Sequence, residues 1–256
     1  MTRFAANVSL LFTELPFLER FAAAAAAGFD TVEFHWPRDE DLGAVATALD
    51  EAGVGVCLMN FDGGDPVAGE RGLMALPERQ AEWRAHVPVA LALARRIGCA
   101  RLHALVGVER PGERDAQLEH AVGELQLAAD AAAEQGAIVL VEALNPVDNG
   151  PVLLPANEDV AAFLDRVAHP ATALQFDAYH AAMLGRDPVA ELERHATRIG
   201  HVQIADCPGR GERGTGAMDV DGFLGALDRL GYAGHVGLEY RPSAGDTLLS
   251  LAAWGA

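Results

Sequence analysis

A single pattern recurs along the chain: a helical stretch, a glycine, a short apolar run and then polar residues. The helical stretch at residues 22–27 is followed by Gly28 and then by the run DTVEFHW. The same succession places a glycine ahead of VGVCLMN, CARLHALV, AIVLVEAL, HVQIAD and HVGLEYR. Glycine just past a helix is a common stop signal, because it adopts left-handed backbone angles without steric cost. The chain is therefore predicted to alternate helices with strands.

The apolar runs are continuous rather than alternating, which is typical of parallel strands covered by helices on both faces. Two further runs, FAANVSLLF at residues 4–12 and TALQFDAYH at residues 172–180, bring the expected strands to eight. Since barrels of this type take about 250 residues, eight strand–helix units predict one α/β domain over residues 1–256, a single (β/α)8 TIM barrel. A doubly wound open sheet is the alternative. It usually has fewer strands, and no G-x-G-x-x-G follows the first run.

Polar side chains stand at the end of every expected strand, where the loops of a barrel build the active site. Four consecutive runs toward the C-terminus end in Glu142, Asp177, Gln203 and Glu239. The other polar residues at strand ends are Asn7, Glu33, His35, Asn60, His103, Asn145, His180, Asp206 and Arg241. Because burying several carboxylates without a counter-charge is costly, a divalent cation is expected among the first four. Oxygen ligands favour Mg²⁺ or Mn²⁺ over Zn²⁺, which prefers cysteine and histidine.

Each of these side chains taken alone could be a helix cap or a solvated loop residue, and only the set of four indicates a metal. His180 follows Asp177 by three residues, so it is predicted to turn into the same mouth. For His35 and His103, the sequence favours a role in the site and a purely structural hydrogen bond about equally. The helical histidines, expected at the surface, are His86, His120 and His195. The strand-end arginines, which could pair with an anionic substrate or remain solvated, are Arg71, Arg210, Arg213 and Arg241.

The chain contains no lysine, so all 19 residues of its lysine-plus-arginine total are arginine. This absence excludes a Schiff-base aldolase, a pyridoxal-phosphate enzyme, a Walker-type nucleotide loop and a kinase. No nucleotide or organic cofactor is expected. The formal net charge of −18 argues against nucleic acid or an anionic membrane as a partner.

Cysteine use predicts a reducing compartment. The three cysteines form no CxxC pair, and the sequence shows no secretion signal, so a cytoplasmic location is expected. Cys57 and Cys99 lie in or beside apolar runs and are predicted to be core residues. Cys207 falls in an expected loop, where a reactive role is a minor alternative. The apolar runs are too short to span a bilayer.

Several stretches are distinctive in combination: FAANVSLLFTELPFLERF, GERG at residues 69–72, VEALN, QFDAYH, HVQIADCPGRGERGTG and GLEYRP. Together they resemble the hydroxypyruvate isomerase family, part of the wider xylose-isomerase-like barrel group, almost from end to end. The resemblance implies a metal held by Glu142, Asp177, Gln203 and Glu239. It also implies that Glu142 and Glu239 act as the acid/base pair.

Two loops depart from the family pattern. Cys207 stands where asparagine is expected in close relatives, and FDGGDPVAGERG is unusual before its GERG end. Both loops border the expected substrate site, so the departures bear on which acid is used. Related ketose epimerases carry a histidine at the position of Gln203, so the glutamine favours the isomerase branch.

The resemblance implies interconversion of hydroxypyruvate and 2-hydroxy-3-oxopropanoate (tartronate semialdehyde) by proton transfer through an enediolate. A divalent metal on the substrate oxygens would stabilise the enediolate, while two carboxylates move the proton. The expected substrate contacts are His180, Arg71, Arg210, Asn145 and His103. The expected partner is a small hydroxy- or oxo-acid, and a homo-oligomer is an expectation for such families.

Other functions remain as alternatives. The closest is 2-oxo-tetronate isomerisation, whose four-carbon substrate also carries a carboxylate. A ketose 3-epimerase or a dehydratase on the same scaffold is less favoured, although a dehydratase begins with the same proton abstraction. An endonuclease-type hydrolase is opposed by the net charge of −18, and a non-catalytic metal-binding protein is the least favoured.

Overall fold

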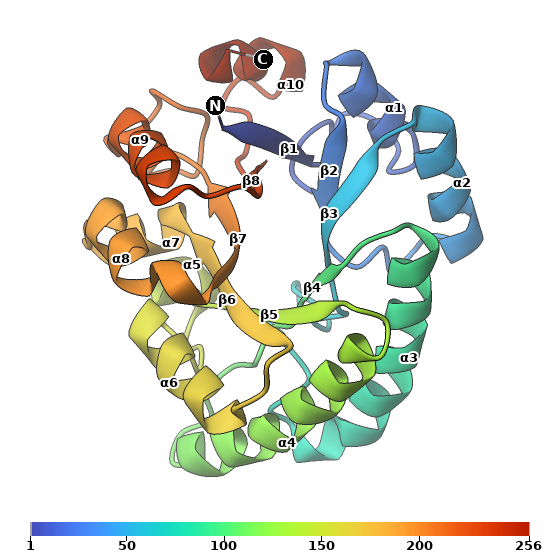
Figure 1. Ribbon diagram of the computed structural model, residues 1–256, viewed down its shortest axis with the longest axis vertical. Helices are drawn as coiled ribbons and strands as arrows, with labels where there is room; N and C mark the ends of the chain where they lie inside the picture. The colour runs from blue at the N-terminus through green and yellow to red at the C-terminus, as the bar shows by residue number, and fades with distance from the viewer. Residues whose placement is uncertain (1, 256) are drawn as a thin grey trace.

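The computed structural model, which describes residues 2–255, contains a closed barrel of eight parallel strands in sequential order. Strand β8 pairs with β1, with Phe4 opposite Val236, and this pairing closes the barrel. Figure 1 looks down the barrel and shows the helices as an outer ring around the strands. The predicted (β/α)8 architecture is confirmed.

The strands are shorter than the apolar runs that predicted them. They are β1 (Arg3–Asn7), β2 (Thr31–Phe34), β3 (Gly55–Asn60), β4 (Arg101–His103), β5 (Ile138–Glu142), β6 (Thr172–Asp177), β7 (Ile199–Ile204) and β8 (His235–Leu238). The first run leaves the sheet after Asn7, whose carbonyl oxygen accepts from the backbone N–H groups of Leu10 and Leu11 in a turn. The run at 172–180 ends as a strand at Asp177, because the Asp177 carboxylate caps the following helix by accepting from the N–H of Tyr179.

The α-helices follow the strands around the barrel. They are α1 (Glu19–Ala26), α2 (Leu42–Ala52), α3 (Gln80–Arg96), α4 (Arg114–Ala133), α5 (Pro146–Asn149), α6 (Asn157–Val167), α7 (Ala178–Met183), α8 (Pro188–His195), α9 (Val220–Leu230) and α10 (Thr247–Leu251). Short 3₁₀ turns occupy Pro77–Arg79, Ala196–Arg198 and Ala252–Trp254. Gly53 ends α2 in the left-handed conformation, as predicted.

Three helical predictions were wrong in detail. Gly234 does not end a helix, because α9 stops at Leu230 and its left-handed cap is Gly231. Gly200 does not stop a helix but lies within β7. A side chain there would meet Leu140 and Ala173 at less than 3 Å, so the glycine serves close packing. His195, expected at the surface, is only 6% exposed, because α8 packs against α9 and α6.

The side chains inside the barrel change from apolar to polar along the barrel axis. A small apolar cluster of Ala5, Cys57, Leu58 and Leu140 fills one level, separate from the large core between strands and helices. Further along the strands, toward their C-terminal ends, the buried residues include Asn7, Glu33, Glu142, Gln175 and Gln203. This change places polar chemistry at the end of the barrel where active sites of this fold lie.

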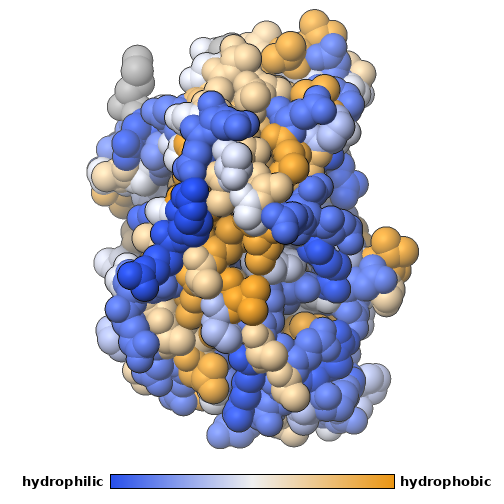
Figure 2. All heavy atoms as spheres, turned by 90° about the vertical axis from the view of Figure 1, so that its right-hand side faces the viewer, coloured by the Kyte–Doolittle hydropathy of each residue, from blue (hydrophilic) through white to orange (hydrophobic). Residues whose placement is uncertain are grey.

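On the outer face, α2 and α3 leave an apolar groove between them. It has a volume of about 710 Å³ and is lined by residues such as Leu42, Ala46, Pro88, Val89 and Leu93. Figure 2 shows apolar side chains gathered on this side of the molecule. Among residues 2–255, no helix combines the length and the apolar character needed to cross a membrane.

Candidate active site

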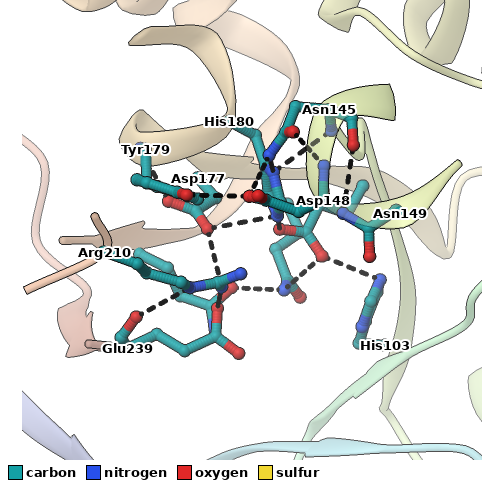
Figure 3. Close-up of polar contacts among 12 residues, drawn as sticks. His103, Asn145, Asp148, Asn149, Asp177, Tyr179, His180, Arg210 and Glu239 are labelled. Carbon is teal, nitrogen blue, oxygen red and sulfur yellow. Dashed lines mark hydrogen bonds and ion pairs between the residues drawn. The ribbon is translucent and has the colours of Figure 1, made fainter. Parts of the chain in front are cut away.

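A cleft of about 760 Å³ opens among the loops that follow the strands. Its lining includes His103, Glu142, Gln175, His180 and Glu239. The four predicted metal ligands come from neighbouring strands, since Glu142 ends β5, Asp177 ends β6, Gln203 lies in β7 and Glu239 follows β8. All four side chains are buried. Figure 3 shows Asp177 and Glu239 on either side of Arg210.

Glu142 is the least satisfied carboxylate in this group. Its Oε1 is buried without a hydrogen-bond partner in the described part of the chain. Its Oε2 lies 3.4 Å from Nε2 of Gln175 and 3.4 Å from Nε2 of His103. Burial raises the pKa of Glu142 well above its ordinary value, and the nearby charges of Glu239 and Asp177 raise it further.

Asp177 has one oxygen committed and one facing the site. Its Oδ1 accepts from the backbone N–H of Tyr179 at 2.8 Å, while its Oδ2 lies 3.2 Å from Nη2 of Arg210. Burial raises the pKa of Asp177 to about 7, and the guanidinium of Arg210 only partly offsets this effect.

Glu239 is held from two sides. Its Oε1 lies 3.0 Å from Nε2 of His35, and its Oε2 accepts from Nη2 of Arg210 at 2.5 Å. Burial alone would raise the pKa of Glu239, but Arg210 and His35 together hold that pKa below its ordinary value. Glu142 and Glu239 are thus held in opposite electrostatic environments.

Arg210 lies inside the acidic cluster. Its guanidinium bridges Asp177 and Glu239 and stacks over the ring of Tyr179, with 5.0 Å between Cζ and the ring centroid. Burial works against its charge, but the nearby carboxylates outweigh burial and raise the pKa of Arg210. Arg210 therefore lies at the predicted site, and its role in binding the substrate stays a prediction.

The loop between β7 and α9 positions Arg210. The Asp206 carboxylate accepts hydrogen bonds from the backbone N–H groups of Cys207, Gly214, Gly216 and Met218. Gly216 has no room for a side chain, since a Cβ there would lie 2.4 Å from the carbonyl oxygen of Cys207. Burial and the charge of Asp206 raise the pKa of the Cys207 thiol, which disfavours the reactive thiolate.

His180 turns into the same mouth as Asp177, as its spacing predicted. Its Nε2 lies 3.6 Å from Oδ2 of Asp177 and 3.7 Å from Oε1 of Glu142. Its Nδ1 accepts from the backbone N–H of Asn145 at 3.1 Å. Burial lowers the pKa of His180 to about 3, so the ring is neutral near pH 7.

His103 and Asn145 are both buried. Burial lowers the pKa of His103 to about 3, and neither ring nitrogen makes a hydrogen bond among residues 2–255. Asn145 caps α5 by accepting from the N–H of Asp148. Its backbone N–H donates to Nδ1 of His180 and so positions that ring. Asn145 does not line the cleft, whereas His103 does.

The remaining arginines differ in their surroundings. Arg71 lines the cleft and donates from Nε to Oδ1 of Asn149 at 3.0 Å, with backbone carbonyl oxygens as its other acceptors. Arg241 also lines the cleft, while Arg213 pairs with Asp221 and does not. Arg71 therefore brings a positive charge to the cleft, and the hydrogen-bond acceptors of its guanidinium are neutral.

Gln175 and His201 lie near the predicted ligands but were not predicted as site residues. Glu33 was predicted only as a polar residue at a strand end. Gln175 stands two residues before Asp177, and His201 two before Gln203. Because side chains alternate along a strand, this spacing points them into the same interior. The alternation of side chains along the two strands was the sequence signal that could have identified Gln175 and His201.

The residues present fit a hard divalent cation. Ligand atoms of Glu142, Asp177 and His180 lie within 4.8 Å of one another, and the unpartnered Oε1 of Glu142 faces this group. Carboxylate and amide oxygens are ligands that Mg²⁺ and Mn²⁺ prefer. The individual assignments of Glu142, Asp177, Gln203 and Glu239 as metal ligands remain predictions.

Comparison with known proteins gives the family. The family model described as "Xylose isomerase-like TIM barrel" matches residues 21–254. The chain is 42% identical to a "Putative hydroxypyruvate isomerase" of Streptomyces coelicolor, over 94% of this chain and 91% of the relative. It is 40% identical to a "2-oxo-tetronate isomerase" of Cupriavidus necator (96% and 95%) and 35% identical to the "Hydroxypyruvate isomerase" of Escherichia coli (94% and 94%).

A solved structure from Brucella melitensis, titled as an AP endonuclease of family 2, superposes on the whole chain. The TM-score is 0.95 at 38% sequence identity, covering 100% of this chain and 98% of the other. The fold, the family model and the curated relatives agree. The chain belongs to the hydroxypyruvate isomerase family, a family of isomerases within the xylose isomerase-like TIM barrels.

Proposed function

We propose that this isomerase interconverts hydroxypyruvate and tartronate semialdehyde, using a bound Mg²⁺ or Mn²⁺. The observation that carries the metal proposal is the buried Oε1 of Glu142, which lacks a hydrogen-bond partner among the described residues and lies beside Asp177 and His180. A buried carboxylate oxygen without a partner is costly, and a cation would compensate it. The names of the relatives support the choice of substrates.

The reaction moves one proton from C3 of hydroxypyruvate to C2 and a second from the C3 hydroxyl to the C2 oxygen. No atoms are gained or lost. When bound, the metal supplies Lewis acidity that makes the C–H beside the carbonyl more acidic. Glu142 and Glu239 stand three strands apart around the barrel, so one carboxylate can remove the proton and the other can return it. Nε2 of His180 faces the same space and can donate to a substrate oxygen.

The substrate carboxylate needs a cationic partner, and arginine is the only basic side chain type besides histidine. Arg71 and Arg210 both line the cleft. Arg210 already contacts Asp177 and Glu239, whereas within residues 2–255 the acceptors of Arg71 are all neutral. We assign the principal carboxylate contact to Arg71, with Arg210 placed closer to the reacting carbons.

A second candidate is isomerisation of the four-carbon 2-oxo-tetronate. The relative with that name is 40% identical over 96% of this chain. The cleft of about 760 Å³ is in the range that accommodates much larger ligands, so its size does not select the shorter acid. A homo-oligomer, a cytoplasmic location, and the absence of nucleic-acid and membrane partners remain predictions.

The test is to incubate metal-stripped protein, with and without added Mg²⁺ or Mn²⁺, with each acid in turn. The proposal predicts metal-dependent formation of tartronate semialdehyde, with a higher kcat/KM for hydroxypyruvate than for 2-oxo-tetronate. The reverse order would favour the second candidate. Loss of water instead of isomerisation would indicate a dehydratase, and no conversion of either acid with either metal would contradict both candidates.

A further inference from the structure

Inside the barrel, beside the predicted metal ligands, lies a carboxylate that the proton transfer does not use. Glu33 of β2 is fully buried. Its Oε1 accepts from Nε2 of Gln203 at 2.7 Å and from Nδ2 of Asn7 at 2.9 Å. Its Oε2 contacts Nε2 of His201 at 2.6 Å. Three side chains from two strands, β1 and β7, thus converge on one buried carboxylate.

The Glu33 carboxylate occupies the space that a side chain at Gly237 of β8 would fill. A Cβ added to Gly237 would lie 2.3 Å from both oxygens of Glu33, which is closer than atoms can approach. Glu33 therefore passes directly over the β8 backbone. The contacts of Glu33 with β1, β7 and β8 fix its carboxylate in a single place.

This placement decides the orientation of the Gln203 amide. An ionised carboxylate oxygen can only accept a hydrogen bond, so Gln203 must turn its NH₂ group toward Glu33. Its carbonyl oxygen then points the other way, where it accepts from Nε2 of Gln175 at 2.5 Å. The reversed amide would set a carbonyl oxygen against the Glu33 carboxylate and an NH₂ group against the NH₂ of Gln175.

We propose that Glu33 is a positioning residue, which makes Gln203 present its carbonyl oxygen, rather than its NH₂ group, to the divalent metal. This inference rests on the proposed function, because it takes Gln203 to be a metal ligand. An amide oxygen has two lone pairs, so it can accept from Gln175 and ligate a cation at once. A hard cation binds oxygen, and the NH₂ group offers it no ligand.

A glutamate at position 203 removes the need for orientation, because both ends of a carboxylate are oxygen. This provides a double-mutant cycle. In the natural background, Glu33→Met removes the acceptor and should weaken Mn²⁺ binding by about 10–100-fold, the usual effect of losing a residue that orients a ligand. In the Gln203→Glu background, Glu33→Met should not weaken Mn²⁺ binding.

The readout is the Mn²⁺ dissociation constant of metal-stripped protein, measured by calorimetry, with thermal unfolding as a check that each variant folds. Two further variants sharpen the comparison. Glu33→Gln keeps an acceptor at this position and should recover part of the lost affinity. Asn7→Ala removes a different donor from the same Glu33 oxygen and should leave Mn²⁺ binding close to that of the unaltered protein.

Equal weakening by Glu33→Met in both backgrounds would overturn the proposal, since it would show a general structural role. Unchanged binding of Mn²⁺ by Glu33→Met would also overturn it. Failure of the unaltered protein to bind Mn²⁺ or Mg²⁺ would refute the metal part of the proposed function, and this inference with it. That failure is distinguishable because it appears before any substitution is made.

Discussion

The backbone N–H of Asn145 donates to Nδ1 of His180 at 3.1 Å. A neutral imidazole carries one proton, so in His180 that proton must sit on Nε2. Nε2 faces Asp177 and Glu142 at 3.6 and 3.7 Å. His180 is therefore arranged as a hydrogen-bond donor toward the site rather than as a metal ligand.

Replacement of His180 by glutamine should separate these two roles. Loss of a donor to developing negative charge on a substrate oxygen typically costs about 10²–10³-fold in kcat, so His180→Gln should lower kcat by this order. Its Mn²⁺ dissociation constant should stay close to that of the unaltered protein, while Asp177→Asn should raise the constant. If His180→Gln weakens Mn²⁺ binding as much as Asp177→Asn does, His180 is a ligand instead.

The two glutamates should each be required for turnover. Glu142→Gln and Glu239→Gln keep the shape of the side chain but remove its ability to exchange a proton. Each should lower kcat by about 10²–10⁴-fold, the usual contribution of a general acid or base. Steady-state kinetics with saturating metal measures this effect. Intact turnover in both variants would refute the acid/base assignment.

Arg71→Ala should reduce the use of anionic substrates selectively. Hydrogen bonds to charged groups contribute about 1.5–3 kcal/mol, so kcat/KM for hydroxypyruvate should fall by roughly 10–100-fold. Arg213→Ala is the matched control, since Arg213 pairs with Asp221 away from the cleft. If both arginine variants behave alike, the substrate carboxylate is bound elsewhere.

The contribution of Asp177 to the stability of the metal-free protein should fall as pH rises from about 4 to about 7. Burial raises the pKa of Asp177 to about 7 in the folded protein, from an ordinary 3.8. In this window Asp177 has lost its proton in the unfolded chain and retains it in the folded chain, so its contribution to the free energy of unfolding decreases with pH. The raised pKa of Glu142 acts in the same direction. The lowered pKa values of His103, His180 and Glu239 act in the opposite direction, so the test is the difference that Asp177 makes. Below this window both states are protonated and the effect vanishes.

Urea denaturation of metal-stripped protein at about pH 5 and about pH 7 measures this dependence. Between these two pH values, the free energy of unfolding of Asp177→Asn should change more favourably than that of the unaltered protein, since the variant lacks the Asp177 contribution. Added Mn²⁺ should stabilise the unaltered protein more at about pH 7 than at about pH 5, because a metal binds the deprotonated carboxylates. Equal slopes for the unaltered protein and Asp177→Asn would argue against the raised pKa of Asp177.

The sequence predicted those parts of the structure that depend on local patterns. Apolar runs located all eight strands, and the strand-end positions of Glu142, Asp177 and Glu239 followed from where each run stops. Strand length was less predictable, because side-chain caps such as that of Asp177 on α7 end a strand within an apolar run. The turn after Asn7 shortened β1 in the same way.

Contacts across the barrel were beyond prediction from one sequence. Glu33 on β2 meets Gln203 on β7 only because the strands close into a barrel, and no local spacing relates residues 170 positions apart. The bridge that Arg210 makes between Asp177 and Glu239 depends on the loop that Asp206 organises. His195 was misplaced at the surface, because its burial depends on how α8 packs against α6 and α9.

The most direct test of the central claim is proton NMR of hydroxypyruvate in D₂O with the metal-stripped protein and added Mg²⁺. If two carboxylates exchange protons with solvent across a metal-held substrate, deuterium should replace the C3 hydrogens and tartronate semialdehyde should appear. Both signals should disappear when the metal is chelated. The account is contradicted if Mg²⁺ or Mn²⁺ produces neither exchange nor aldehyde, or if chelation leaves both unchanged.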